Sequence, residues 1–236
     1  MQGKIMTTKV AVIAGVGPGL GASLARLFSR QGFKLVLAAR NVAKLDALAA
    51  ETGAEVISTD VSDPASVENL FHAVDGIGPL SLAIFNAAGR VRGDIADLNP
   101  EEVRKALLVG AYGGFLFGQQ AARRLLVGGA GSILFTGATA SVKGFANSAG
   151  FAMPKFGLRG LAQSMARELA PKNIHVAHFV IDGGIASSDP MRAPDSTPPD
   201  RWLSPDAIAE AYLAIHLQHR SAWTWEIELR PWVETF

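Results

Sequence analysis

The chain has 236 residues, 49 % of them hydrophobic, which is enough for one large domain with a sizeable core. Lysine and arginine total 22 against 21 aspartates and glutamates, so the net charge of +1 indicates no basic surface for nucleic acid. The absence of cysteine excludes disulfides, iron–sulfur clusters and a cysteine nucleophile, and we expect a cytoplasmic protein.

Short apolar runs alternate with helical patterns in the first half of the chain. The apolar runs predict strands at residues 9–14, 34–39, 54–58 and 80–85. Helical spacing predicts helices at residues 19–31, after a cap at Asn41, and after Asp63 and Pro64. Strands that alternate with helices in this way are typical of a parallel sheet with right-handed crossovers.

The same alternation continues in the second half. It predicts helices at residues 101–126, 151–170 and 204–217, and strands at 132–136, 174–181 and 222–229. Residues 186–203 are rich in proline and polar side chains, so we expect a substrate loop inserted there. No stretch of about 20 apolar residues predicts a membrane span. The fold prediction is one α/β domain over residues 1–236, with a doubly wound seven-stranded parallel sheet and helices on both faces.

A glycine-rich turn follows the first predicted strand and opens the first helix, reading Gly15-Val-Gly-Pro-Gly19-Leu20-Gly21. Glycines there let the backbone approach the pyrophosphate of a dinucleotide at the helix N-terminus. Arg40 ends the second strand, where an acidic residue would bind the ribose of NAD, and an arginine there suits the 2′-phosphate of NADP. A solvated arginine is the alternative, and Asn41 and Lys44 could serve the same phosphate.

Together these motifs resemble those of the short-chain dehydrogenase/reductase family over nearly the whole chain. The family's glycine motif corresponds to Gly15, Gly19 and Gly21, its acidic-hydrophobic pair to Asp60-Val61, and its NNAG turn to Asn86-Ala87-Ala88-Gly89. The resemblance implies a Rossmann fold that binds a nicotinamide dinucleotide, and a homodimer or homotetramer. Arg40 favours NADP(H) over NAD(H) as that dinucleotide. The residues expected to bind the cofactor are Gly15, Gly19, Leu20, Gly21, Arg40, Asn41, Asp60, Val61, Asn86, Ala87, Ala88, Gly89, Lys155 and Gly183.

The family's catalytic set is incomplete in this chain. By the resemblance, Lys155 corresponds to the family's lysine that binds the nicotinamide ribose. Phe151 stands at the position of the family's tyrosine, and Ala138 stands at the position of its serine. The family's helix asparagine aligns with Gly110. General acid–base catalysis is worth about 10²–10⁴ in rate, so we expect carbonyl reduction by the usual route to be severely impaired.

Other side chains could supply a proton, but for each of them a structural role is the simpler alternative. Asp182 ends the sixth strand, where aspartates usually cap or turn the chain. Ser148 has the spacing from Lys155 at which related enoyl reductases carry a tyrosine, and Thr139 adjoins the vacant serine position, yet aliphatic hydroxyls donate protons poorly. Tyr112 lies near Gly110 on a helix and could instead pack there.

No metal site is predicted. His175 and His178 are three apart in a strand and therefore lie on opposite faces, and the chain carries no HExxH pattern.

Two functions fit the sequence. The first is an NADP(H)-dependent oxidoreductase that transfers hydride to a small, hydrophobic carbonyl or enone-type substrate and takes its proton from an atypical source. Its pocket would be formed by Ala138, Phe151, Met153 and residues 186–203. The second is a catalytically silent NADP(H)-binding sensor or assembly module that keeps Lys155 only to hold the ribose.

Overall fold

The computed structural model describes residues 9–187, 190–193 and 199–234. In chain order the first half contains β1 (Val10–Ala14), α1 (Leu20–Arg30), β2 (Lys34–Ala39), η1 (Val42–Leu45), α2 (Asp46–Thr52), β3 (Glu55–Ser58), α3 (Pro64–Ile77) and β4 (Leu80–Phe85). The second half contains α4 (Pro100–Leu107), η2 (Leu108–Tyr112), α5 (Gly113–Gly128), β5 (Gly131–Thr136), η3 (Thr139–Ser141), α6 (Ala149–Leu169), η4 (Ala170–Lys172), β6 (Ile174–Ile181), η5 (Pro190–Arg192), α7 (Pro205–His216), η6 (Arg220–Ala222) and β7 (Glu226–Leu229).

The strands form one seven-stranded sheet in the order β3-β2-β1-β4-β5-β6-β7. Every neighbouring pair is parallel. The chain winds outward from β1 to β3 and then returns to β4 on the other side of β1, so the strand order reverses between β1 and β4. Ligands of such sheets bind at this reversal, beyond the carboxyl ends of the strands. The predicted doubly wound parallel sheet is confirmed.

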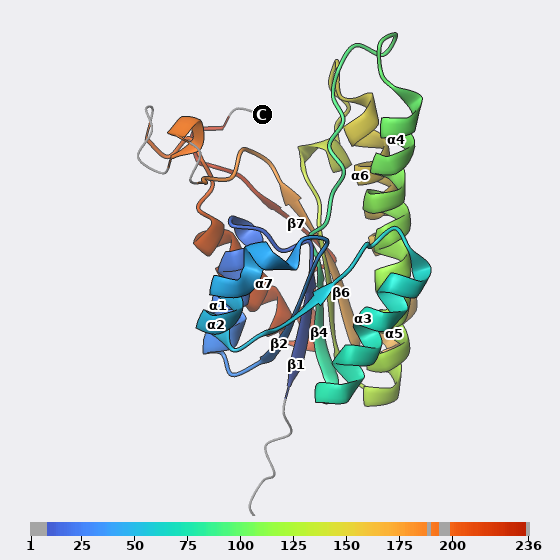
Figure 1. The fold of residues 1–236 in the computed structure, drawn as a ribbon, viewed down its shortest axis with the longest axis vertical. Helices are drawn as coiled ribbons and strands as arrows, with labels where there is room; N and C mark the ends of the chain where they lie inside the picture. The colour runs from blue at the N-terminus through green and yellow to red at the C-terminus, as the bar shows by residue number, and fades with distance from the viewer. Residues whose placement is uncertain (1–8, 188–189, 194–198, 235–236) are drawn as a thin grey trace, which may run out of the picture.

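Helices cover both faces of the sheet. In Figure 1, α1, α2 and α7 lie on one face, and α3, α5 and α6 lie on the other. Side chains along β1 alternate between the two layers: Val10, Val12 and Ala14 pack in one core, and Ala11 and Ile13 pack in the other. All five are fully buried. Near-continuous apolar strands are therefore required here, because each strand is covered on both faces.

Two local predictions need correction, and the helical region predicted at residues 101–126 contains one irregular turn. The last strand begins at Glu226 and not at residue 222, because a 3-10 turn at Arg220–Ala222 precedes it and the Gln218 side chain bonds to Thr224. The Asn41 side chain makes no cap hydrogen bond, and a 3-10 turn separates it from α2. The helical region predicted at 101–126 contains a π-helical turn, η2, at Leu108–Tyr112.

The predicted loop at 186–203 lies partly outside the described residues, because 188–189 and 194–198 are not among them. Its two ends are joined. The amide of Ala186 donates to the carbonyl of Leu203 at 2.9 Å, and the amide of Leu203 donates to the carbonyl of Gly184 at 2.9 Å. This places the described part of the segment beside the carboxyl end of β6. None of the helices in the described ranges is long and apolar enough to cross a membrane.

Candidate cofactor and substrate site

The glycines of the turn after β1 fall into two groups. Gly15 has φ +82°, and a Cβ there would lie 2.4 Å from the backbone nitrogen of Ala87. A Cβ on Gly21 would lie 2.9 Å from the Cα of Val16. These two glycines are required by the protein's own packing.

Gly17 and Gly19 have no such neighbours, since a Cβ at either position would meet nothing within 4 Å. Gly19 is the N-cap of α1, and the first turn of that helix holds no acidic side chain. The open space therefore lies where the helix presents its free amides and the positive end of its dipole. The residues present fit a dinucleotide pyrophosphate, which is an anion that needs close approach to the backbone.

Arg40 and Asp60 lie close together at the carboxyl ends of β2 and β3. Hydrogen bonds from the Ser62 amide (2.9 Å) and hydroxyl (2.6 Å) to Oδ1 lower the pKa of Asp60, and the charge of Arg40 contributes to the same shift. Arg40 and Asn41 are both exposed, and Val61 is buried. A charged donor and a carboxylate acceptor therefore stand at one corner of the sheet edge, where a phosphorylated ribose and an adenine could each find a partner.

The turn after β4 is joined to the glycine turn. Nδ2 of Asn86 donates to the carbonyl of Gly15 at 2.9 Å, and the Asn86 amide donates to the carbonyl of Ala14 at 2.8 Å. A Cβ on Gly89 would lie 2.5 Å from the Cα of Ala106, so this glycine allows α4 to approach the turn. The side-chain and backbone amides of Asn86 therefore hold the two turns of the sheet edge together.

Lys155 is the buried cation of the site. Its side chain reaches from α6 to the end of β5, where Nζ donates to the carbonyl of Thr136 at 2.7 Å. The residue is 5 % exposed, and burial lowers its pKa to about 8. The structure thus places an ammonium group beneath the edge of the sheet, within reach of a ligand that lies above it.

No hydroxyl stands at the two positions that the family resemblance assigns to the catalytic tyrosine and serine. Phe151 lies in the first turn of α6 and is buried, and Ala138 follows β5, with its amide donating to Oγ of Ser141 at 3.1 Å. Gly110 lies buried in η2, where a Cβ would be 2.7 Å from the Cβ of Pro154. An asparagine at position 110 would therefore clash with the residue that precedes Lys155.

The comparisons with known proteins agree with this arrangement. A family model described as short chain dehydrogenase matches residues 9–195. The chain belongs to this family. It is also 32 % identical over 180 residues to trans-4-hydroxycyclohexanecarboxylate dehydrogenase of Sinomonas cyclohexanicum, covering 71 % of this chain and 69 % of that protein.

Solved structures of family members match nearly the whole chain. A short-chain dehydrogenase from Rhodopseudomonas palustris is 38 % identical, with a TM-score of 0.82, covering 95 % of this chain and 99 % of that one. An alcohol dehydrogenase from the archaeon Thermococcus sibiricus, complexed with 5-hydroxy-NADP, is 26 % identical, with a TM-score of 0.84, covering 97 % of this chain and 98 % of that one. The chain is thus a family member of the oxidoreductase type with a nucleotide-binding Rossmann fold.

The substitute proton donors have other partners. The Thr139 hydroxyl donates to Oδ1 of Asp182 at 2.5 Å, and Arg230 pairs with Oδ2 of Asp182 at 2.7 Å. Oγ of Ser148 donates to the carbonyl of Phe145 at 2.8 Å, and Ser148 is only 1 % exposed. These contacts give Asp182 and Ser148 structural roles at the site.

Tyr112 and Met153 are both exposed side chains. Tyr112 is 41 % exposed and stacks on Phe115 at a centroid distance of 6.3 Å. Met153 does not join Ala138 and Phe151 in a pocket as the sequence predicted. It lines a separate groove of about 340 Å³ between α4 and α6, whose lining is Ile95, Leu98, Pro100, Val103, Arg104, Leu107, Ala149, Gly150 and Met153. The reason is the helical period, because two residues after Phe151 the side chain has turned to the outer face of α6.

The sequence missed Arg90 and Arg92. Both guanidinium groups lie over the ring of Phe151, at 5.7 Å and 5.6 Å from its centroid. The available signal was their position, because they directly follow a turn, Asn86 to Gly89, that the resemblance assigns to the cofactor.

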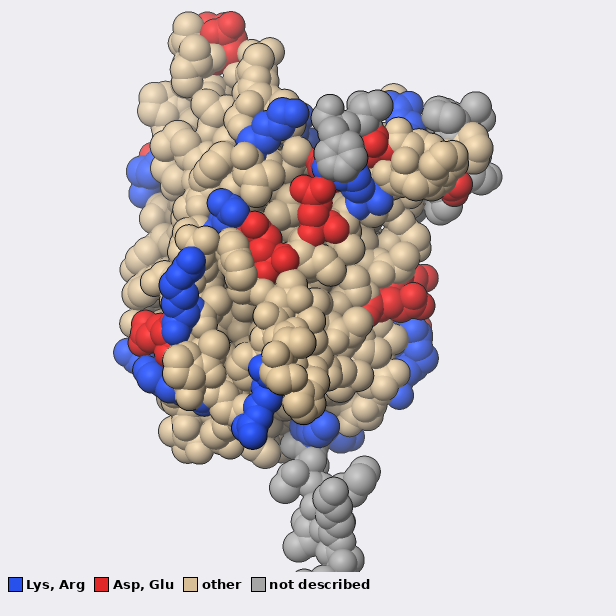
Figure 2. Space-filling view, turned by 180° about the vertical axis from the view of Figure 1, so that it is seen from behind, with Lys and Arg blue, Asp and Glu red and all other residues tan. Residues whose placement is uncertain are grey.

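Other polar groups lie away from this edge. His175 stacks on Trp223 with a centroid distance of 4.7 Å, and Nδ1 of His178 is 3.0 Å from Oε2 of Glu226. Within the described ranges, no three side chains of the metal-binding types gather into a group. On the face seen in Figure 2, acidic and basic side chains are interspersed.

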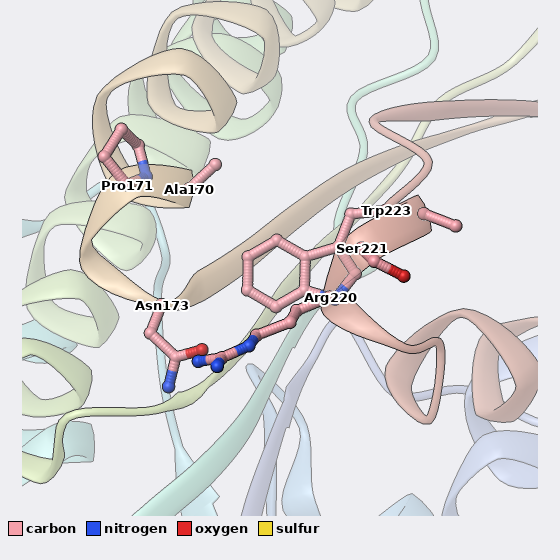
Figure 3. A pocket seen from close by; sticks show the side chains of 7 residues that line it. Ala170, Pro171, Asn173, Arg220, Ser221 and Trp223 are labelled. Carbon is pink, nitrogen blue, oxygen red and sulfur yellow. The ribbon is translucent and has the colours of Figure 1, made fainter.

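A cavity of about 440 Å³ lies at the other end of the sheet. It is lined by residues of η4, by Asn173, by η6 and by Trp223, and Figure 3 shows the side chains of Arg220 and Asn173 extending toward one another. These residues precede β6 and β7, whereas the cofactor residues follow their strands. The cavity is therefore remote from the candidate site.

Proposed function

We propose that the protein is an NADP(H)-dependent oxidoreductase that transfers hydride to a small carbonyl or enone-type substrate without a tyrosine acid. The observation that carries this proposal is the combination of open space at the N-terminus of α1 with the buried ammonium of Lys155 at the same edge. A chain that had lost its cofactor would have no need of a buried cation there, because burial of an unused charge costs stability.

The preference for NADP(H) over NAD(H) rests on Arg40. Its guanidinium is exposed at the end of β2, where it could form a charge-assisted bidentate contact with a 2′-phosphate. The Thermococcus sibiricus relative was solved with 5-hydroxy-NADP, and its likeness to this chain supports the same choice here. The further cofactor contacts are proposed for the turn residues named above, for Lys155 and for Gly183, whose φ of +147° suits glycine.

The absence of a tyrosine proton donor favours an enone over a ketone as the substrate. The cofactor, when bound, supplies hydride chemistry. In an enone reduction, hydride would add to the β-carbon, the C=C electron pair would form the enolate bond between the α-carbon and the carbonyl carbon, and the C=O pair would move to oxygen. Water would then protonate the α-carbon. Because solvent can protonate an enolate after the hydride step, the loss of the tyrosine costs this reduction less than it costs a ketone. Lys155 would bind the ribose and orient the ring. Ala138 and the ring of Phe151 supply the apolar surface against which the substrate would lie.

The test begins with binding. Energy transfer from the tryptophans to the bound nicotinamide should show a dissociation constant for NADPH of micromolar or below. The dissociation constant for NADH should be higher. The second step measures the oxidation of NADPH in the presence of 4-phenylbut-3-en-2-one. Tight binding of NADPH with no turnover of enones or carbonyl compounds would overturn the oxidoreductase proposal and leave the silent sensor.

A double variant examines the vacant positions directly. Phe151→Tyr with Ala138→Ser should create ketone reductase activity if the rest of the pocket is intact. Phe156→Tyr is the matched control, because Phe156 lies on α6 and is 44 % exposed. Activity in the control alone would contradict the assignment of positions 151 and 138.

Assembly and location are part of the proposal. We propose a homodimer or homotetramer in the cytoplasm, with a substrate loop at 186–203. Sedimentation velocity of the full chain would test the assembly, since a monomer at micromolar concentration would contradict it.

A further inference from the structure

Three cations surround the ring of Phe151. The guanidinium groups of Arg90 and Arg92 lie 5.7 Å and 5.6 Å from its centroid, and Nζ of Lys155 lies 5.9 Å from it. The ring itself is only 9 % exposed, whereas both arginines are exposed. The arginines come from the segment after β4 and the lysine comes from α6. Two separate parts of the chain thus bring positive charge to the position where the family has its tyrosine.

The segment that carries the two arginines is anchored at both ends. Val91 packs on the start of α6, where a Cβ on Gly150 would lie 3.1 Å from the Cβ of Val91. The amide of Gly93 donates to the carbonyl of Asn147 at 3.0 Å. Arg90 and Arg92 flank Val91, so the same contacts fix the backbone of both. The backbone that carries the arginines is therefore fixed before any ligand binds, which lowers the entropy cost of binding.

Among the described residues, the charges that act on Arg90 are positive. Burial lowers its pKa, and the positive charges of Arg92 and Arg192 lower it further. In the described part of the chain, no carboxylate forms an ion pair with Arg90 or Arg92. Exposed arginines normally find an acidic neighbour or spread apart, because like charges at short range repel. A cluster of this kind is best stabilised by an anion from outside the protein.

We propose that Arg90 and Arg92 bind an acidic group of the substrate, a carboxylate or a phosphate, beside the ring of Phe151. This inference rests on the proposed function and names the class of its substrate. Phenylalanine cannot donate a hydrogen bond, so the guanidinium groups are the donors that a substrate meets there. A guanidinium holds a carboxylate or phosphate through two parallel hydrogen bonds, which would fix the orientation of the reducible bond.

The cofactor's own phosphates are a less suitable occupant. The space for the pyrophosphate lies at the N-terminus of α1, after β1, and Arg40 lies after β2. Arg90 and Arg92 follow β4, across the reversal of strand order. The two anion sites therefore follow different strands, with the pyrophosphate space directly after β1 and the two arginines beyond the turn after β4.

The experiment is a ¹⁹F NMR titration of the full chain with 4-fluorobenzoate, with and without saturating NADP⁺, and with 4-fluorobenzyl alcohol as the neutral probe. Inorganic phosphate is added as a competitor to distinguish the two acidic groups. The test variant is Arg90→Gln with Arg92→Gln. The matched control is Arg123→Gln with Arg167→Gln, which removes the same charge from exposed positions on α5 and α6.

We expect the wild-type protein to bind 4-fluorobenzoate and not the alcohol, with at least tenfold weaker binding in the Arg90/Arg92 variant and unchanged binding in the control. Competition by phosphate would show that the site accepts either acid. Equal binding of the two probes, or equal loss in both double variants, would overturn the inference even if NADPH binds. Loss of NADPH affinity in the Arg90/Arg92 variant would also overturn it, because the arginines would then hold the cofactor. Failure of the wild type to bind NADPH would refute the proposed function separately.

Discussion

Gly110 and Gly160 are both helical glycines, and alanine at the two positions should have opposite effects on stability. In a helix interior, Gly→Ala normally stabilises by about 0.5–1 kcal/mol, because alanine loses less backbone entropy on folding. Gly160 is exposed on α6, and a Cβ there would meet nothing within 4 Å. Gly160→Ala should therefore gain this amount.

At Gly110 the new Cβ would lie 2.7 Å from the Cβ of Pro154. Both atoms are attached directly to backbone, so neither can move without shifting a helix. Overpacking of this kind costs about 1–3 kcal/mol, which exceeds the propensity gain. Gly110→Ala should thus lower the free energy of unfolding by about 1–2 kcal/mol.

Urea unfolding followed by tryptophan fluorescence measures both variants, with an unchanged m-value as the check on two-state behaviour. A Pro154→Gly background removes the opposing Cβ, so Gly110→Ala should be neutral or stabilising there. The reasoning is refuted if Gly110→Ala is as stable as Gly160→Ala, or if the Pro154→Gly background leaves its cost unchanged.

Three further predictions concern the cofactor edge. Arg40→Glu should weaken NADPH binding by about 10- to 100-fold and leave NADH binding nearly unchanged. The reason is that a hydrogen bond to a charged group is worth about 1.5–3 kcal/mol. An equal loss of affinity for both cofactors in a fluorescence titration would contradict this. Gly17→Ala should unfold at the same urea concentration as the wild type yet bind NADPH at least tenfold more weakly, since its Cβ would enter only ligand space; unchanged affinity would mean that the pyrophosphate lies elsewhere. Burial lowers the pKa of Lys155 from 10.5 to about 8, so between about pH 8 and 10.5 the unfolded chain binds more protons than the folded protein. The wild type should therefore gain stability relative to Lys155→Met as the pH rises through this window, and a parallel pH profile of the two proteins would argue against a buried charge.

Sequence periodicity was sufficient for the sheet and for most helices. The strands of a sheet covered on both faces are short apolar runs, and residues such as Asp63 and Ser204 cap the following helices with side-chain hydrogen bonds in the structure. The start of β7 was not visible, because Trp223 and Trp225 have strand propensity but belong to a turn held by the Gln218 side chain. Propensity is local, whereas this turn depends on a side chain five residues or more away.

The candidate site was predictable as a list of residues but not as an arrangement. The strand pattern placed Gly15, Asp60 and Asn86 after the first, third and fourth strands, and the parallel sheet brings them to one edge. No pattern along the chain indicates that Arg90 and Arg92 cover Phe151, because that contact joins segments about 60 residues apart. The steric conflict between positions 110 and 154 was hidden for the same reason, since it arises only when η2 packs against α6.

The two outermost strands of the sheet, β3 and β7, have four residues each, and the inner strands have five to eight. An edge strand exposes a row of unpaired amides and carbonyls that can recruit another chain, and a short edge exposes few of them. Pairing of strands between molecules is therefore disfavoured at both edge strands. The protein should tolerate concentrated solution without forming fibrils, and any association of its copies through paired strands would be limited to a few hydrogen bonds.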